Sequence, residues 1–344
     1  MKVIQFIHTI SSGGAEAVML RLHHGFLEKR VEAKIAVFKK SEEFYSLPKD
    51  VDLLNINKNS LKAKSQILSY LKSEKADLIL VHMCSVHSIF SKIDYPNIFL
   101  IVHLDIFYKY QHKTNFLKQM IFKRKINKIY NNHQTITVSN NIRESMLLNF
   151  NIDSSKIRTI HNPFDFSTIR YKSEEEIEIK EDYLLHIGRF EAIKRHDILI
   201  EAFKNISNKN IKLVLLGEGA LKDKIQTLLN QYDMKDRIIF LGWQSNPFKY
   251  IKNAKAVILS SDSEALPNVL IESLILHIPV VSTATLGARE ILIDELKNYL
   301  SKVNDADDLA RKIDLALNSY SKIDNKYYAH FEINKVLEKY LSLI

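Results

Sequence analysis

The sequence predicts an α/β protein of two Rossmann-like domains that face a central crevice, and three observations support this. Short apolar segments alternate with amphipathic helical stretches along the chain, which is typical of parallel sheets with helical crossovers. The alternation is interrupted once by a polar, acidic segment and then restarts. With 344 residues, 46% of them hydrophobic, the chain is also large enough to bury two cores.

The first half begins with a strand over 3–10, a turn, and a helix over 15–29, and a later helix is expected over 140–150. Its further strands are expected over 33–39, 76–83, 97–104, 134–139 and 157–162. The segment 167–182 then carries four glutamates within five positions. Because such charge blocks are usually solvated, we expect a domain linker there.

The second half repeats the pattern, with helices expected over 305–320 and 333–344. Its strands are expected over 182–190, 211–219, 237–243, 254–261 and 278–283. The predicted boundaries are therefore a first domain 1–166, a linker 167–182, a second domain 183–325 and a terminal helical segment 326–344.

The net charge of +9 is unevenly distributed. Residues 1–170 hold 25 Lys and Arg against 14 Asp and Glu, whereas residues 171–344 hold 24 against 26. The first half therefore favours an anionic partner. Its most basic stretch, 112–130, fits either the exposed face of a core helix or an anionic membrane surface. Nucleic acid is not expected, because no known reading motif is present and the second half is acidic.

A few features of the sequence indicate the cellular location and whether a metal is bound. The single cysteine, Cys84, excludes an internal disulfide and favours a reducing compartment. The first ten residues suit a strand better than a signal peptide, and the longest apolar run is too short to span a bilayer. The thirteen histidines follow no known metal-ligand spacing. We expect a cytoplasmic protein without a metal.

Two glycines, Gly13 and Gly14, lie between the first strand and the first helix in the sequence SSGG. Glycine permits close approach of the backbone to a ligand, and the amides at a helix start favour an anion. The spacing differs from GxGxxG, so a dinucleotide is not indicated. A plain tight turn explains the same residues equally well.

Charged residues follow two strands of the second half. Gly188 and Arg189 end one strand, with Lys194 five residues further on, and Glu264 and Glu272 occupy SSDSEALPNVLIES after another. Cations at strand ends suit a diphosphate, whereas carboxylates, which only accept hydrogen bonds, suit sugar hydroxyls. The combination predicts a nucleoside diphosphate sugar, with the cations stabilising the departing diphosphate.

The ordered segments GRFEAIK, LLGEGALKDKI, FLGW, SSDSEALPNVLIES and IPVVSTATLGAREIL, over most of 182–292, resemble the GT-B glycosyltransferases of glycosyltransferase family 4. Weaker agreement in the first half comes from SSGGAE, VSNNIRE, IHNPFD and His103 after a strand. The closing helix is similar to the family's terminal segment, which returns to the first domain. Ala265 and His277 depart from the family by standing where glycine is common.

The resemblance implies a role for each matched position. Arg189 and Lys194 hold the diphosphate, Glu272 binds the ribose, and Glu264 contacts the donor sugar. Gly13 and Gly14 let the first domain approach the phosphates and acceptor, and His103 lies beside the transferred sugar. The catalytic set is Arg189, Lys194, Glu264 and His103, and the other donor-binding positions are Gly13, Gly14, Gly188, Gly242, Trp243, Asn268, Val269, Glu272 and Gly287.

The implied reaction is retaining transfer of a hexose or N-acetylhexosamine, from a UDP-sugar rather than a GDP-sugar, to a hydroxyl of a lipid-linked or surface-glycan acceptor. Its setting is bacterial polysaccharide synthesis at the inner face of the cytoplasmic membrane, with no metal and no cofactor beyond the donor substrate. Two alternatives stay open, a nucleotide-sugar epimerase of the same fold and a non-catalytic nucleotide-sugar-binding partner of another transferase.

Overall fold

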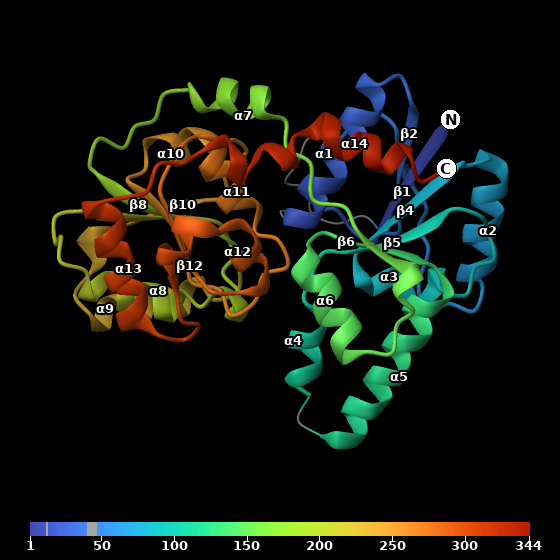
Figure 1. Cartoon of the computed structure of the whole chain (residues 1–344), viewed down its shortest axis with the longest axis horizontal. Helices are drawn as coiled ribbons and strands as arrows, with labels where there is room; N and C mark the ends of the chain where they lie inside the picture. Colours follow the sequence, from blue (N-terminus) through green and yellow to red (C-terminus); the bar gives the residue numbers. More distant parts are fainter. Residues whose placement is uncertain (12, 40–46, 114) are drawn as a thin grey trace. The chain divides into compact units, whose positions relative to one another are not determined.

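The computed structural model describes all residues except 12, 40–46 and 114. The described chain divides into two compact units. Unit 1 comprises Met1–Pro163 and Phe331–Ile344, and unit 2 comprises Phe164–His330. Each unit is an α/β body with its own parallel sheet and its own buried core (Figure 1).

Unit 1 is built on a parallel sheet in the order β3-β2-β1-β4-β5-β6-β7. Its strands are β1 (Lys2–Ile7), β2 (Glu32–Val37), β3 (Val51–Leu53), β4 (Leu78–His82), β5 (Ile98–Val102), β6 (Gln134–Thr137) and β7 (Ile157–Thr159). Its helices are α1 (Gly14–Glu28), α2 (Ala63–Glu74), α3 (Cys84–Phe90), α4 (Ile106–Gln111), α5 (Phe116–Asn132), α6 (Asn140–Asn149) and α14 (Ile333–Leu341).

Unit 2 has the parallel order β10-β9-β8-β11-β12-β13, the strand order of a Rossmann fold. Its strands are β8 (Tyr183–Ile187), β9 (Lys212–Leu216), β10 (Ile238–Gly242), β11 (Ala256–Leu259), β12 (Val280–Thr283) and β13 (Leu300–Ser301). Its helices are α7 (Phe166–Ser173), α8 (His196–Asn205), α9 (Lys222–Gln231), α10 (Phe248–Asn253), α11 (Asn268–Ile275), α12 (Leu286–Ile291) and α13 (Ala306–Asn318).

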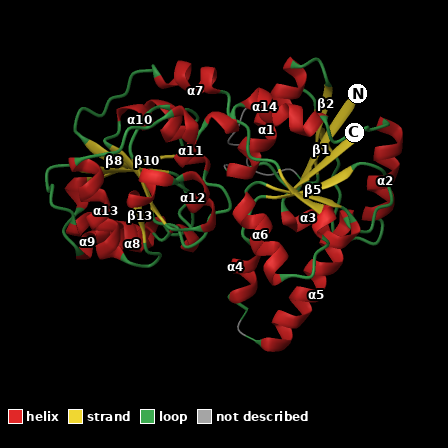
Figure 2. Ribbon diagram, viewed as in Figure 1, coloured by secondary structure: helices red, strands yellow, loops and turns green. Residues whose placement is uncertain are grey.

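Helices cover both faces of each sheet (Figure 2). In unit 2, α8 contacts α9 and α13, while α11 contacts α7, α10 and α12. Central strands are consequently buried on both faces, as in β4 and β5, where every residue is buried. Continuous apolar runs such as LILVH and IFLIV follow directly from this two-sided burial.

Every strand predicted from the sequence is present, and each is shorter than predicted. The excess residues lie mostly in the loops at the ends of the strands, where the donor-site residues were expected. The predictions lacked β3 and β13, which are three and two residues long and lie at the edges of their sheets. An edge strand this short leaves no periodic apolar signal.

The acidic segment predicted as a linker, 167–182, is partly helical. Helix α7 occupies its first part and packs against α10 and α11 of unit 2. At the other end of the chain, α14 packs against α1 within unit 1. That contact is close, since a Cβ atom on Gly25 would lie 2.6 Å from Cδ1 of Leu337.

Candidate functional site

The predicted donor residues of unit 2 lie at the ends of neighbouring strands or in the loops and helices that follow them. Arg189 follows β8, Glu264 follows β11, and Gly287 belongs to α12 after β12. These three strands are adjacent and parallel in the order β8-β11-β12. Their carboxyl ends therefore share one edge of the sheet, where open α/β sheets bind ligands.

Lys194 and Glu264 form an ion pair at this edge. Lys194 Nζ donates to Glu264 Oε1 at 2.6 Å, and Ser261 Oγ donates to the same oxygen at 2.7 Å. Ser260 Oγ in turn donates to the Lys194 carbonyl at 2.8 Å, so the loops after β8 and β11 are tied together. Both of these donors bind the same oxygen of Glu264, Oε1.

Two predicted glycines let these loops pack closely. The Gly287 amide donates to the Glu264 carbonyl at 3.0 Å, and a Cβ atom on Gly287 would lie 2.6 Å from the backbone of Ala265. A Cβ atom on Gly188 would lie 3.2 Å from His186 Nε2 and 3.5 Å from Cδ of Lys194. A side chain at Gly287 would displace the loop that holds Glu264, whereas a Cβ atom at Gly188 would meet only side-chain atoms at or slightly below ordinary contact distance.

The other predicted residues of unit 2 differ in exposure. Arg189 is exposed and pairs with Glu191 at 3.2 Å, so its guanidinium can reorient towards an anion. Glu272, by contrast, is 7% exposed on α11. Trp243 is half-buried just after β10, and Asn268 and Val269 begin α11.

Gly242 ends β10 with φ of +68°, in the left-handed region that favours glycine. A Cβ atom there would lie 2.8 Å from Oε1 of Glu218. Lys222 neutralises that carboxylate at 3.2 Å. The loop with the predicted donor-binding residues Gly242 and Trp243 is thus shaped by its own glycine and bordered by a charged pair that the sequence did not single out.

In unit 1, Gly13 caps the amino end of α1 and Gly14 is the first helical residue. Ser11 Oγ donates to Oε1 of the buried Glu16 at 2.7 Å, and a Cβ atom on Gly13 would lie 2.2 Å from Oε2 of that carboxylate. A side chain at position 13 would therefore have to displace the Glu16 carboxylate. Ser12, also part of the predicted turn, lies outside the described residues.

His103 lies directly after β5 and is half-buried. Its Nε2 is 2.9 Å from Nδ1 of His82, the last residue of β4, and the two rings stack with centroids 5.2 Å apart. Burial, with a smaller contribution from His87, lowers the pKa of His103 to about 3. The ring is accordingly neutral at physiological pH, and suits a hydrogen bond to a sugar better than a charge contact with phosphate.

Sequence reasoning missed Arg195, whereas it placed His186 in a strand as a hydrogen-bonded core residue, and both support these positions. Arg195 Nη1 contacts Asp262 at 3.1 Å and joins the same two loops as the Lys194 pair. His186 is fully buried, donates from Nδ1 to the Ile258 carbonyl at 2.9 Å, and has a pKa lowered to about 4 by burial. The charged residues next to one another in KRHD, residues 194–197, are the sequence signal that could have identified Arg195.

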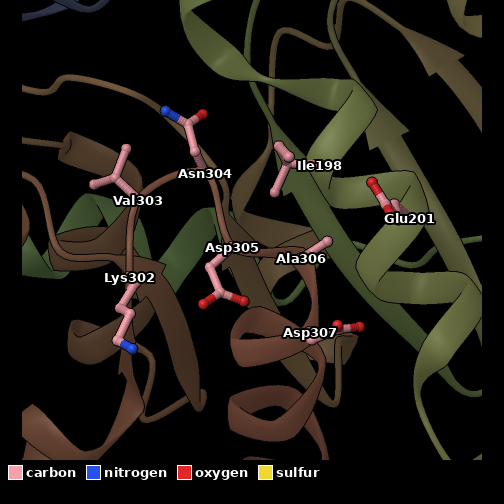
Figure 3. Close-up of a pocket in the computed structure, with 8 residues that line it drawn as sticks. All are labelled: Ile198, Glu201, Lys302, Val303, Asn304, Asp305, Ala306 and Asp307. Atoms are coloured by element: carbon pink, nitrogen blue, oxygen red, sulfur yellow. The ribbon is translucent and has the colours of Figure 1, made fainter.

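A cavity of about 400 Å³ in unit 2 has none of the predicted donor residues in its lining (Figure 3). The lining side chains come from α8 and from the loop that leads into α13, and they are Ile198, Glu201, Lys302, Val303, Asn304, Asp305, Ala306 and Asp307. Its three carboxylates repel phosphate, so it does not suit a nucleoside diphosphate. Among the described residues, no group of three or more His, Cys, Asp and Glu side chains is placed to hold a metal ion.

Comparison with known families identifies the chain. A model described as "Glycosyltransferase Family 4" matches residues 12–168, and one described as "Glycosyl transferases group 1" matches residues 168–333. The chain belongs to glycosyltransferase family 4. It is a glycosyltransferase with the GT-B fold, and its two units are the Rossmann-like domains of that fold.

Several relatives have names that describe their reactions. An N-acetylgalactosaminyltransferase of Campylobacter jejuni, named for transfer to a diphospho-undecaprenol-linked glycan, is 28% identical over 317 residues, which cover 87% of this chain and 85% of that protein. A lipopolysaccharide 1,6-galactosyltransferase of Salmonella typhimurium is 25% identical over 61% of this chain and 58% of its own length. The relatives thus include bacterial transferases for lipid-linked glycans and lipopolysaccharide.

Solved structures support the fold. The Anabaena protein HepE in complex with UDP and glucose superposes with a TM-score of 0.81 at 16% identity, covering 99% of this chain and 98% of that one. A Rickettsia africae glycosyltransferase gives 0.80 at 17% identity, covering 99% and 97%. Within the described part of this glycosyltransferase, no helix combines the length and apolarity needed to cross a bilayer.

Proposed function

We propose that this enzyme transfers an N-acetylhexosamine or hexose from a UDP-sugar to a hydroxyl of a lipid-linked or surface-glycan acceptor. The observation that carries the proposal is the Lys194–Glu264 pair at the carboxyl edge of the unit 2 sheet, with Arg189 exposed after β8, the strand that Lys194 also follows. Cations and carboxylates at one sheet edge match the two halves of a nucleoside diphosphate sugar.

The pair allows one ammonium to serve two partners. An ammonium has three N–H donors, so Lys194 can keep its bond to Glu264 while donating to a diphosphate oxygen. As the bond to the sugar breaks, negative charge grows on the diphosphate, and the fixed position of Lys194 stabilises it. Arg189 adds a second donor, Glu272 holds the ribose, and Glu264 accepts from a sugar hydroxyl. Retention of configuration is proposed from family membership.

UDP is the proposed nucleotide. In the solved HepE structures the bound molecules are UDP, UDP-glucose, or UDP and glucose, and the Staphylococcus aureus protein TarM was solved with UDP. Relatives in Campylobacter jejuni and Staphylococcus aureus are named as N-acetylgalactosaminyl- and N-acetylglucosaminyltransferases. These names favour an N-acetylhexosamine over a plain hexose.

The acceptor side is proposed to work at the inner face of the cytoplasmic membrane. Helix α5 carries Phe116, Leu117 and Ile121 exposed beside a row of basic side chains, Lys118, Lys123, Arg124, Lys125 and Lys128. Figure 1 shows α4 and α5 extending from the sheet of unit 1. A helix with exposed apolar and basic residues suits the interface of an anionic bilayer, where a lipid-linked acceptor resides.

A panel of nucleotide sugars tests the donor. We expect UDP and a UDP-N-acetylhexosamine to raise the melting temperature more than GDP-mannose does. A synthetic undecaprenyl-diphosphate-linked oligosaccharide should then release free UDP together with an elongated product. A shift with GDP-mannose alone would reject UDP. Interconversion of the nucleotide sugar without acceptor would favour an epimerase, and donor binding without any turnover would favour a non-catalytic partner.

A further inference from the structure

A chain of three polar side chains runs through unit 1 from α1 to the end of β5. Gln5 on β1 donates from Nε2 to the Met19 carbonyl at 3.2 Å. His82 Nε2 lies 3.1 Å from Gln5 Oε1, and His82 Nδ1 lies 2.9 Å from His103 Nε2. Gln5 and His82 are completely buried, and His103 is half-buried.

The Met19 carbonyl, at one end of this series of hydrogen bonds, determines where every proton of the series lies. The Met19 carbonyl can only accept, so the amide nitrogen of Gln5 faces it and Gln5 Oε1 faces His82. An oxygen acceptor requires an N–H at His82 Nε2. A neutral imidazole carries one N–H, so His82 Nδ1 holds a lone pair and accepts from His103 Nε2. The remaining nitrogen of His103, Nδ1, is then an acceptor.

Both imidazole rings must be neutral for the hydrogen bonds to run in this direction, from His103 to His82 and from His82 to Gln5. Burial lowers the pKa of His82 well below its usual value, and neighbouring histidines lower it further. The pKa of His103 is lowered to about 3, mainly by burial. At neutral pH, the reverse direction would place the lone pair of His82 Nε2 against Gln5 Oε1, or a Gln5 oxygen against the Met19 carbonyl. Two facing acceptors in a buried site leave both unsatisfied, which is costly.

We propose that Gln5 and His82 are positioning residues that hold His103 in its Nε2–H tautomer, so that His103 Nδ1 accepts a hydrogen bond from a hydroxyl of the transferred sugar. The assignment of the sugar as partner rests on the proposed function, whereas the tautomer depends on unit 1 alone. The consequence is selectivity, because an acceptor nitrogen favours a sugar that presents a hydroxyl at this point over one that presents an ether or hydrogen.

The tautomer is tested by nitrogen-15 spectroscopy of the histidine-labelled full chain, with His103 assigned from the signals lost in His103→Asn. We expect a protonated Nε2 and an unprotonated Nδ1 in the wild type. His82→Phe, which removes the acceptor, should shift His103 to a mixture of tautomers. His82→Asn, whose Oδ1 can replace the lone pair of Nδ1, should restore the wild-type pattern.

A matched control is His87→Phe. His87 is also buried in unit 1, but its nitrogens contact Tyr130 OH and the Val81 carbonyl, so its loss should leave the tautomer of His103 unchanged. Gln5→Leu should release the tautomer. A protonated Nδ1 in the wild type would overturn the proposal even if every variant of Gln5 and His82 failed to fold. The same conclusion would follow if a folded His82→Phe left the His103 signals unchanged.

The sugar contact is tested by kinetics. His82→Phe should raise KM for the UDP-sugar by about tenfold, the scale of one lost hydrogen bond, while the Kd for UDP alone stays within twofold. His82→Asn should recover most of the loss. Equal weakening of UDP and UDP-sugar would reject the contact. If the wild type binds no nucleotide sugar, the proposed function fails, and the spectra still decide the tautomer.

Discussion

Lys194 and Glu264 are 70 positions apart in the sequence, yet their charged atoms lie 2.6 Å apart. Both side chains are mostly buried, so the pair stays ordered without ligand. An ordered ammonium does not have to be immobilised when the donor binds, which preserves binding free energy for the transition state. The pair thus combines a structural role between two loops with the proposed chemical one.

Lys194→Ala should reduce turnover by roughly 100-fold or more, the scale observed when a fixed charge-stabilising group is removed. The measurement is kcat for UDP release with acceptor present. Lys255→Ala is the matched control, because Lys255 also forms an ion pair in unit 2, with Asp182 at 3.0 Å, but precedes β11 instead of following it. A loss in Lys194→Ala no larger than the loss in the control would refute the role.

Glu272→Gln should weaken UDP binding by roughly 10- to 100-fold, because a hydrogen bond to a charged group contributes about 1.5–3 kcal/mol. The amide keeps the volume of this buried side chain, so no cavity is introduced. Titration calorimetry with UDP gives the affinity directly, and Glu201→Gln on α8 is the control. Unchanged affinity would separate Glu272 from the ribose.

At the scale of elements, the loop after β11 and the start of α12 act as one piece. The backbones of Gly287 and Ala265 touch, and the Gly287 amide bonds the Glu264 carbonyl. The position of the Glu264 carboxylate therefore depends on a glycine 23 residues further along the chain. The family motif placed this glycine near the donor, but the reason for it, backbone contact with the adjacent loop, comes from the structure.

Gly287→Ala should displace this loop, because the added Cβ would meet backbone atoms at 2.6 Å. We expect a loss of about 1–3 kcal/mol in the free energy of unfolding, the usual cost of overpacking. UDP-sugar affinity should fall as well. Urea unfolding and calorimetry measure the two effects, with Ala288→Gly in the same helix as the control. Full affinity in the alanine variant would show that the loop position does not affect binding.

Helix α5 supports a prediction about membranes. Changing Lys123, Arg124 and Lys125 to glutamine should reduce sedimentation with anionic vesicles, because each basic residue near such a surface contributes about 1 kcal/mol. The control is the same change at Lys62, Lys64 and Lys72, which are exposed on α2 or directly before it. This variant loses the same net charge, and we expect little effect on its sedimentation with vesicles. Equal losses in both triple variants would indicate a general charge effect and leave α5 a structural helix.

Across the whole molecule, both units bury neutral histidines. Burial lowers the pKa of His87 in unit 1 and His186 in unit 2 to about 4, and that of His196 to about 2. The unfolded chain protonates these rings near pH 6.5, whereas the folded chain does not. Below that pH the unfolded state binds more protons, so stability is complete above about pH 6.5 and falls as the pH decreases.

We therefore expect the free energy of unfolding to decrease from about pH 6.5 towards pH 4, by up to about 1.4 kcal/mol per pH unit for each such histidine. Urea unfolding at several pH values measures the slope. His196→Phe should flatten it in unit 2, because this ring packs against Phe190 and, among the described residues, makes no hydrogen bond. A variant slope equal to that of the wild type would contradict the assignment of this histidine.

The sequence by itself determined the fold class, the strands of both sheets except two short edge strands, and the positions of the charged donor-site residues. Buried parallel strands require continuous apolar runs, and loops at their carboxyl ends carry the polar residues, so both leave local patterns. The roles of those residues as donor ligands remain predictions that the experiments above address.

Only the tertiary structure decided which of these residues meet. It joined Lys194 to Glu264, packed Gly287 on Ala265, and linked Gln5, His82 and His103 through three different strands and loops. Such contacts depend on strand order and on the packing of loops, which bring together positions 20 to 80 residues apart. The local sequence contains no information about that order. A buried glutamine or histidine therefore cannot be distinguished from an ordinary core residue until the structure shows its partner.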